Sequence, residues 1–422
     1  MTIEKPINQN YCATVVEIKN VIEFDNCDNI VGTNFFGFQA VINKKTKPGT
    51  IGILFPAETR LSEKYCSENN LFRHSNLNKD ESVQGYIENN RRVKAVKFRN
   101  NRSDSLFMPL SSLGWTGIDI SSLKLGDEFD HLNGEQICEK YAIKRRESKK
   151  YDRKLVKIFR RVDKKFLPEH IDTSNWFKFE ESIKDEEKII VTQKLHGTSI
   201  RVANTIVKRK LNPIEWLLRL TGIKIAETEY DCVFGSRKVI KDINNPDHKH
   251  FYNEDIWTRE GKKIVDSIPE NFIVYGELIG WSGIGSKIQE GYTYEIEDGQ
   301  SEIFIYRVAQ INGQGILTDL SWDQVVDFCK QRGLKYVPEL WRGEKKDFDA
   351  NNYLDVKLND QYRHCIPVGG KVVDEGICVR VEGMIPDIYK AKSPLFFEHE
   401  TKLMDKGIID LETQGSDEQT NS

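Results

Sequence analysis

KIIVTQKLHGTSIRV, residues 188–202, is the segment from which the fold and the chemistry of this chain are best approached. Its first half is rich in β-branched residues and predicts a strand that ends at Lys194. Gly197 permits a tight turn, and a second strand begins near Ile200. A lysine at a strand end beside a cavity is partly desolvated and lies near other cations. Both effects favour the neutral, nucleophilic amine, so Lys194 is a candidate nucleophile.

This motif alone has little specificity, because any surface lysine before a turn would match it. Five further short motifs follow it in the chain in a fixed order. They are FGSRK at 234–238, VYGEL at 274–278, FIYR at 304–307, DEGI at 374–377 and YKAKS at 389–393. A chance match to one of them is common, whereas the complete series in order is not.

The ordered series resembles the covalent nucleotidyltransferase superfamily, which includes polynucleotide ligases and mRNA capping enzymes. The motifs of that superfamily are K-x-[DH]-G, S-R, G-E, an aromatic strand, E-G and K-x-K, in this order. The resemblance implies an α+β fold, with an ATP-grasp-like ligase domain built on antiparallel sheets with flanking helices. It also implies that Lys194 becomes covalently linked to AMP.

The resemblance assigns roles to the other charged motif residues. Lys390 and Lys392 share one face of a strand-like run and would stabilise the α-phosphate of ATP during attack by Lys194. Glu277 and Glu375 are the candidate ligands for Mg²⁺ or Mn²⁺, since carboxylate oxygens suit hard cations. In the superfamily the first of these glutamates often contacts the ribose, so both roles stay open for Glu277.

The remaining assignments concern the nucleotide and the RNA end. His196, Gly197 and Arg201, beside the nucleophile, are implied to help bind the nucleotide. Arg237 suits bidentate phosphate binding, for instance of an incoming 5′-phosphate. Tyr306 would stack on adenine. The next residue departs from the family pattern, because position 307 is usually Asp in RNA ligases and is Arg here.

The residues before these motifs indicate a separate domain. Residues 1–140 contain strand-like runs at 11–19, 35–43, 50–55, 93–98 and 105–110, with little helical pattern between them. We predict an OB-like β-barrel that binds RNA, as such barrels often bind single-stranded nucleic acid. A basic linker at 141–175, a nucleotidyltransferase domain at 176–405 and an acidic flexible tail at 406–422 complete the predicted organisation.

The order of these domains narrows the resemblance to one family. DNA ligases and capping enzymes carry an OB domain after the last motif, but only 30 residues follow Lys392 here. The β-rich region instead precedes Lys194. This order, the His-Gly pair after the lysine and the phrase RVKAVKFRNNRSDSLFMPLSSL at 92–113 resemble the Naegleria-type RNA ligases.

The implied activity is ATP-dependent joining of RNA 3′-OH and 5′-phosphate ends through lysyl-AMP and RNA-adenylate intermediates, with repair of nicked duplex RNA as the expected role. One alternative is a DNA ligase or a GTP-using capping enzyme with the same lysine chemistry. An alternative of another class is a non-catalytic RNA-binding protein with a degenerate ligase domain. The filled reactive positions argue against the latter.

Composition agrees with an intracellular enzyme. Of 422 residues, 30% are charged and 38% hydrophobic, and no run approaches the roughly 20 apolar residues of a membrane span. The N-terminus lacks the apolar core of a signal peptide. The eight cysteines form no CxxC pair, so we predict reduced thiols. We expect a cytoplasmic monomer with no membrane partner.

Two helices are predicted from their end signals. Asn212-Pro213 begins one over IEWLLRL, and Gly222 ends it. Ser321 with Gln324 forms a capping-box pattern at the start of the other, WDQVVDFCKQR, which ends before Gly333.

Overall fold

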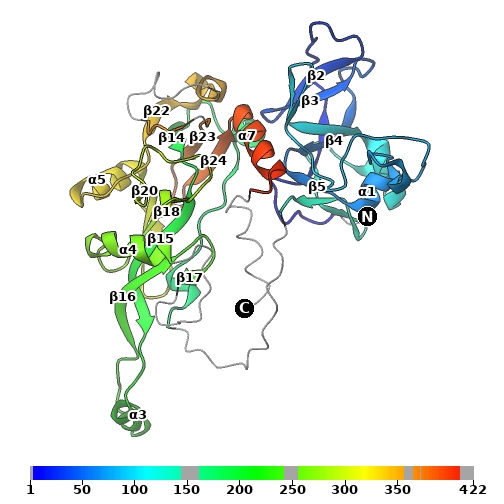
Figure 1. Ribbon diagram of the computed structural model, residues 1–422. Helices are drawn as coiled ribbons and strands as arrows, with labels where there is room; N and C mark the ends of the chain where they lie inside the picture. The colour runs from blue at the N-terminus through cyan, green and yellow to red at the C-terminus, as the bar shows by residue number, and fades with distance from the viewer. Residues whose placement is uncertain (1–2, 144–160, 242–254, 356–364, 371, 409–422) are drawn as a thin grey trace. The chain divides into compact units, whose positions relative to one another are not determined.

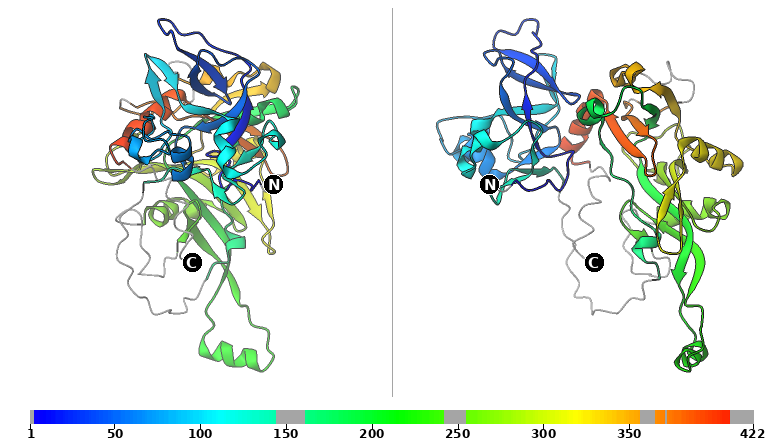
Figure 2. Two further views of the ribbon diagram at one scale, coloured as in Figure 1. Left: turned by 90° about the vertical axis from the view of Figure 1, so that its right-hand side faces the viewer. Right: turned by 180° about the vertical axis from the view of Figure 1, so that it is seen from behind.

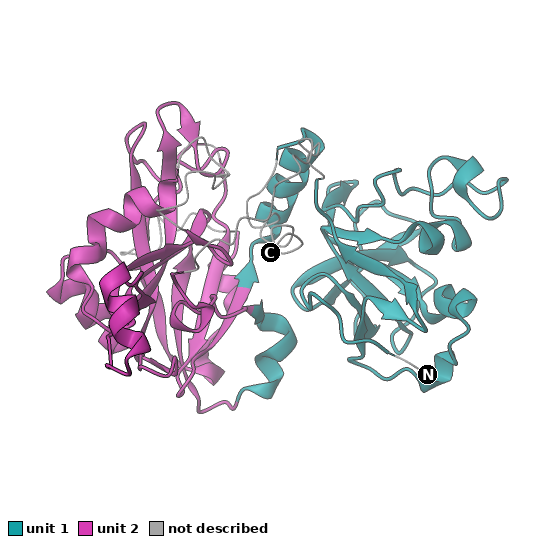
Figure 3. Ribbon diagram, turned by 90° about the horizontal axis from the view of Figure 1, so that it is seen from below, with its two compact units in different colours: residues 1–143, 174–183, 391–409 teal, residues 144–173, 184–390, 410–422 magenta. Residues whose placement is uncertain are grey.

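The computed structural model describes residues 3–143, 161–241, 255–355, 365–370 and 372–408. The chain forms two compact units, which Figure 3 shows in different colours. Unit 1 comprises 1–143, 174–183 and 391–409, and unit 2 comprises 144–173, 184–390 and 410–422. The predicted basic linker and acidic tail lie partly outside the described residues, so these two assignments stay predictions.

Unit 1 is built on a six-stranded sheet in the order β2-β3-β8-β4-β1-β9. The α+β class is confirmed, but the OB-like barrel is not, because no pairing joins β9 to β2 within the described residues. The strands are β1 Ala13–Glu17, β2 Ile30–Phe35, β3 Phe38–Asn43, β4 Ile51–Pro56, β8 Ser105–Pro109 and β9 Glu128–Phe129. Shorter pairs are β5 Thr59–Leu61 with β12 Cys138–Lys140, β6 Val96–Phe98 with β7 Asn101–Ser103, and β10 His131–Leu132 with β11 Glu135–Gln136.

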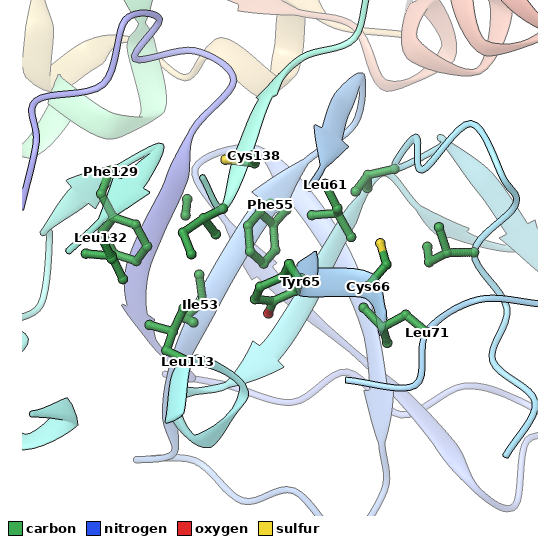
Figure 4. Close-up of a cluster of buried hydrophobic side chains, with 14 of the residues drawn as sticks. Ile53, Phe55, Leu61, Tyr65, Cys66, Leu71, Leu113, Phe129, Leu132 and Cys138 are labelled. Atoms are coloured by element: carbon green, nitrogen blue, oxygen red, sulfur yellow. The ribbon is translucent and has the colours of Figure 1, made fainter. Parts of the chain in front are cut away.

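The core of unit 1 lies between this sheet and the short helix α1, Glu63–Glu68. Figure 4 shows Phe55 and Tyr65 at its centre, and their rings meet edge to face at 5.3 Å. The C-terminal helix α7, Pro394–Asp405, also belongs to unit 1, because Thr401 accepts hydrogen bonds from Arg92 and Ala95. Residues 174–183, with the short strand β13 Ser174–Asn175 and helix α2 Trp176–Phe179, are tied in by an ion pair of 2.6 Å between Lys178 and Glu128.

Unit 2 contains a seven-stranded sheet in the order β17-β16-β15-β18-β20-β21, with β19 paired to β18 (Figure 1). The strand pairs of this sheet are antiparallel within the described residues, as predicted. The strands are β15 Thr198–Lys208, β16 Thr228–Gly235, β17 Ile240–Lys241, β18 Phe272–Gly283, β19 Ser286–Lys287, β20 Ser301–Ile311 and β21 Leu317–Asp319.

A second antiparallel sheet of unit 2 places β24, β23, β14 and β22 side by side in this order. These strands are β14 Lys188–Lys194, β22 Glu339–Glu344, β23 Gly376–Val381 and β24 Asp387–Lys392. Since β14 belongs to this sheet and β15 to the other, the turn at 195–197 connects the two sheets. The strand end predicted for Lys194 is therefore confirmed, and it lies where the chain passes between the sheets.

Both helices predicted from their end signals are present. They are α3, Pro213–Leu220, and α5, Trp322–Gln331, and each has a complete capping box at its first turn. A further helix, α4 Ile256–Ile264, was not predicted. All eight cysteines are free thiols, as predicted. Among the described residues, no helix is long and apolar enough to cross a membrane.

Candidate active site

Lys194 and Glu375 form the centre of the candidate site. Lys194 is the last residue of β14 and is paired in register with Gly376, the first residue of β23. This register places Glu375 beside the lysine, and its Oε2 accepts a hydrogen bond of 2.8 Å from the Lys194 ammonium. The side chains are only 12% and 0% exposed. The candidate nucleophile is therefore held by a buried carboxylate.

The turn after Lys194 is shaped by a close backbone approach. A Cβ at Gly197 would lie 2.2 Å from the carbonyl oxygen of Leu278, so no other residue fits without a shift of β18. The Gly197 amide donates to Oε1 of Glu277 at 3.0 Å, and its carbonyl accepts from Gln289 at 2.8 Å. Glu277 and Glu375 are thus both brought to the 194–197 segment.

His196 is buried in this turn. Its backbone amide donates to the Tyr294 hydroxyl at 2.6 Å, and its ring meets Tyr292 edge to face at 4.7 Å. The ring Nδ1 lies 3.5 Å from Oε2 of Glu375. His196 therefore contacts the same carboxylate oxygen that binds Lys194, which fixes the orientation of Glu375.

Four of the predicted charged residues interact electrostatically with the Cys378 thiol on β23. Burial raises the pKa of the Cys378 thiol to about 11; Lys194 and Lys390 oppose this rise, while Glu375 and Glu277 add to it. All four charges act on the pKa of this one half-buried thiol, so two cations and two acids lie in one region. This is the grouping that the motif order predicts.

Lys390 and Lys392 alternate with buried Ala391 along β24, so they share a strand face as expected. Lys390 lies in unit 2 with the residues above. Lys392 is assigned to unit 1, where its ammonium lies 5.0 Å from the centre of the Phe396 ring.

Tyr306 lies on β20 and packs against the core of the seven-stranded sheet. Its hydroxyl hydrogen-bonds to Nδ1 of His170 and interacts with the Ser199 side chain. Burial, followed by the charge of Glu277, raises the pKa of this hydroxyl well above its ordinary value. The phenol is therefore neutral, and its polar end lies among site residues.

The two predicted arginines differ in their surroundings. Arg237 is one-third exposed, and its Nη2 donates to the exposed carboxylate of Asp172 at 3.1 Å. Arg201 is 1% exposed and donates to the backbone carbonyls of Ser236 and Leu167, both at 2.7 Å. Arg201 thus holds the turn that carries Arg237, which differs from the nucleotide contact expected of it.

The departure at position 307 has a structural explanation. The Arg307 guanidinium forms a two-pronged ion pair with Asp319 on the neighbouring strand β21, with one bond at 2.9 Å. The side chains are 4% and 1% exposed. The guanidinium carbon also lies 4.4 Å from the centre of the Tyr275 ring. Arg307 is therefore buried together with an acidic partner, Asp319, which lies twelve residues later in the sequence.

Sequence reasoning missed three residues that shape the site, namely Tyr294, Gln289 and His170. The first two contact the 196–197 backbone through side-chain hydrogen bonds. None of the three lies in a recognised motif. The only signal for the tyrosine is its place in the aromatic pair of GYTY at 291–294.

The part of the chain that holds the candidate site matches a known protein family. The RNA ligase family model matches residues 187–392. Residues 187–392 are an RNA ligase domain. The resemblance drawn from the ordered motifs is therefore confirmed, and the matched range contains every motif from Lys194 to Lys392. No curated protein matches this chain in sequence.

Solved structures extend the likeness of fold beyond the RNA ligase domain. Naegleria gruberi RNA ligase with PPi is 16% identical, with a TM-score of 0.57, and the match covers 92% of this chain and 98% of that one. A mutant of the same ligase with ATP and Mn is 18% identical, with a TM-score of 0.56 and coverage of 93% and 98%. Another, with AMP and Mn, is 16% identical with a TM-score of 0.57 and coverage of 92% and 98%. These matches show that the chain shares this fold.

The close approach at Gly197 gives a first testable prediction. Replacing Gly197 with Ala forces the Leu278 carbonyl and β18 to move, which we expect to cost roughly 1–3 kcal/mol of unfolding free energy. The shift of Glu277 should also lower covalent nucleotide labelling about a hundredfold. Gly313→Ala is the control, because its nearest neighbour would lie 3.8 Å from the added Cβ. Equal behaviour of the two variants would contradict the proposed tight turn.

Proposed function

We propose that this chain is an ATP-dependent RNA ligase that joins RNA 3′-OH and 5′-phosphate ends through AMP carried on Lys194. The observation that carries the proposal is the placement of Lys194 at the end of β14, hydrogen-bonded to buried Glu375 in the matched RNA ligase domain. The solved Naegleria gruberi ligases of the same fold contain ATP or AMP with Mn, which supports the same nucleotide here.

The proposed reaction has three steps, each a displacement at phosphorus. The Lys194 amine attacks the α-phosphorus of ATP, so that a P–N bond forms, the P–O bond to pyrophosphate breaks and the ammonium proton is lost. An oxygen of the RNA 5′-phosphate then attacks the same phosphorus and the P–N bond breaks, returning the amine. Finally the 3′-OH attacks the activated 5′-phosphate, AMP leaves and the phosphodiester forms.

The chain's own residues prepare the first step. A carboxylate at hydrogen-bond distance favours the charged ammonium, so the ion pair with Glu375 keeps Lys194 in its unreactive form. Binding of a metal cation by Glu375 would release the amine for attack. Lys390 interacts electrostatically with the same thiol, Cys378, as Lys194 does. Its ammonium is therefore suited to hold the α-phosphate. Tyr306 would lie against the adenine, with its hydroxyl fixed by His170.

The acids fit a divalent cation of the Mg²⁺ or Mn²⁺ type. Within the described residues no group of three or more His, Cys, Asp or Glu side chains is placed to hold a metal. Two carboxylates, Glu277 and Glu375, do converge on the 194–197 segment. Such cations often bind one or two protein carboxylates and complete their shell with water and substrate phosphates. When bound, the cation would act as a Lewis acid on the α-phosphate.

Metal removal and a carboxylate variant test this part of the proposal. We expect EDTA to abolish labelling of the protein by ATP, and Mn²⁺ or Mg²⁺ in excess to restore it. Glu375→Gln removes the charge that would pair with both the cation and Lys194, so labelling should fall at least about a hundredfold. Glu290→Gln, at an exposed carboxylate on the loop before Tyr292, is the control and should label normally. Full labelling of the Glu375 variant in EDTA would refute the metal assignment.

The proposed RNA contacts involve Arg237 and residues of unit 1. Arg237 is one-third exposed and its guanidinium contacts the exposed carboxylate of Asp172, so it suits the incoming 5′-phosphate. Unit 1 would supply RNA contacts in the role expected of an OB-like domain. The proposal includes nicked duplex RNA as the substrate, RNA repair as the role, a monomeric enzyme and a cytoplasmic location.

The nucleotide specificity is tested by incubating the protein with α-³²P-labelled ATP or GTP and separating it on a denaturing gel. We expect a covalent label from ATP and none from GTP, which would exclude a capping enzyme. A label from GTP alone would refute the proposal. The absence of a label from either nucleotide, on folded protein with either metal, would favour a non-catalytic RNA-binding protein.

A further inference from the structure

The hairpin formed by β15 and β16 carries a short helix whose apolar side chains are exposed. The two strands pair from Arg201 with Gly235 out to Lys208 with Thr228. Helix α3 follows at the far end of this hairpin, as Figures 1 and 2 show. None of its residues is buried. It takes no part in the candidate active site, so its role needs a separate explanation.

The exposed side chains of this tip are large and apolar. The exposed fractions are Ile214 70%, Trp216 56%, Leu217 59%, Leu218 39%, Leu220 64% and Ile223 52%. A helix of eight residues is marginal in water unless packing supports it. Strong capping by Asn212 and Glu215 defines the helix, yet its apolar side chains stay in contact with solvent. A surface of this kind usually marks a binding site.

The arrangement around the helix is strongly amphipathic. At 100° per residue the five apolar positions cover an arc of about 200°, and Glu215 and Arg219 occupy the remainder. A partner's groove accepts a narrower stripe, so part of this arc would stay exposed there. A helix of this length is about 12 Å long, too short to bury the roughly 800 Å² per partner of a stable interface with a second copy.

Positive charge flanks the apolar face. From 208 to 224 the chain has one acid, Glu215, and five cations, namely Lys208, Arg209, Lys210, Arg219 and Lys224, which gives 5 − 1 = +4. Glu215 is bound by Arg209 at 2.6 Å. Including Glu227 and Glu229 on the returning strand, the total stays positive at 5 − 3 = +2. The charge therefore matches an anionic surface.

We propose that the α3 tip, residues 208–224, docks on the surface of an anionic phospholipid bilayer. Helices with Trp and Leu on a wide face and Lys or Arg around it lie in the interface between headgroups and acyl chains. Each cation near such a surface adds electrostatic attraction. RNA fits the tip less well, since Trp216 alone offers a ring for base stacking and its neighbours are aliphatic. The expectation of no membrane partner came from the lack of a spanning segment, and surface docking needs none.

The test uses the full chain and vesicles in a flotation assay. Wild-type protein should float with phosphatidylcholine–phosphatidylglycerol vesicles and not with phosphatidylcholine alone. The double variant Trp216→Glu with Leu217→Glu should bind the anionic vesicles at least roughly tenfold more weakly. The matched control is Ile284→Glu with Ile316→Glu, two apolar side chains of unit 2 that are 90% and 62% exposed. It should bind like wild type.

Labelling by ATP in all three proteins reports folding and is expected to be equal, because the tip lies outside the candidate active site. Three results would overturn the proposal. The first is that wild-type protein does not bind anionic vesicles, and the second is that the Trp216→Glu, Leu217→Glu double variant binds them as well as wild type. The third is that this double variant selectively loses affinity for duplex RNA or the ability to form dimers. The vesicle readout does not depend on ligation, so its failure leaves the proposed enzyme activity untouched.

Discussion

Lys194→Ala is expected to abolish covalent labelling of the protein by ATP. The ε-amine is the only group of that residue able to form the P–N bond, so its loss leaves no acceptor for AMP. The label should fall to background, and joining of unadenylylated RNA should be lost with it. Sealing of RNA that already carries a 5′-adenylate should persist, because that step bypasses the lysine. The measurement is gel analysis with α-³²P-labelled ATP, followed by mass spectrometry of the peptide that contains residue 194.

Lys188→Ala is the matched control for this prediction. Lys188 begins the same strand, β14, and is exposed. It should label like wild type, since its side chain is six residues from the nucleophile. A label that survives in the Lys194 variant, or that maps to another lysine, would contradict the assignment.

Arg307→Ala is expected to lower the free energy of unfolding more than any other single substitution considered above. It leaves the carboxylate of Asp319 on strand β21, whose side chain is 1% exposed, without its arginine partner. Removing one partner of a buried ion pair typically costs about 3–5 kcal/mol of unfolding free energy. Urea unfolding followed by tryptophan fluorescence measures this loss.

Two further variants separate charge from packing. Glu302→Ala lies on the same strand, β20, but its pairing with Lys335 is on the surface, so the loss should be about 0–1 kcal/mol. Arg307→Met combined with Asp319→Leu removes both charges and should recover most of the stability. If Arg307→Ala costs no more than the surface variant, the ion pair does not stabilise the fold. If the folded variant fails to label, Arg307 also has a role in the chemistry.

Local signals in the sequence predicted much of unit 2. The β-branched run before Lys194, the Asn212-Pro213 start signal and the capping box at Ser321 each depend on residues within one turn or strand, and all three are confirmed. Helix α4 was missed because Gly261 interrupts its helical pattern. The structure explains that glycine, since a Cβ there would lie 2.3 Å from the Phe234 ring.

Non-local features were not predictable in the same way. His170 meets Tyr306 across 136 residues, and Asp319 compensates the unusual Arg307 from a neighbouring strand. Neither contact has a local pattern. In unit 1, alternating strands are equally compatible with a closed barrel and with an open sheet, so strand prediction alone did not decide between them.

The most direct test of the central claim is joining of a nicked RNA duplex by the full chain with ATP and Mn²⁺ or Mg²⁺. One nick should carry a ³²P-labelled 5′-phosphate and a 3′-OH, a second should lack the phosphate, and a third should be the same nick in DNA. The account predicts an ATP-dependent joined RNA product, preceded by RNA-adenylate, and none from the nick without phosphate. Joining of DNA alone, or no joining by protein that is adenylylated on Lys194, would contradict it.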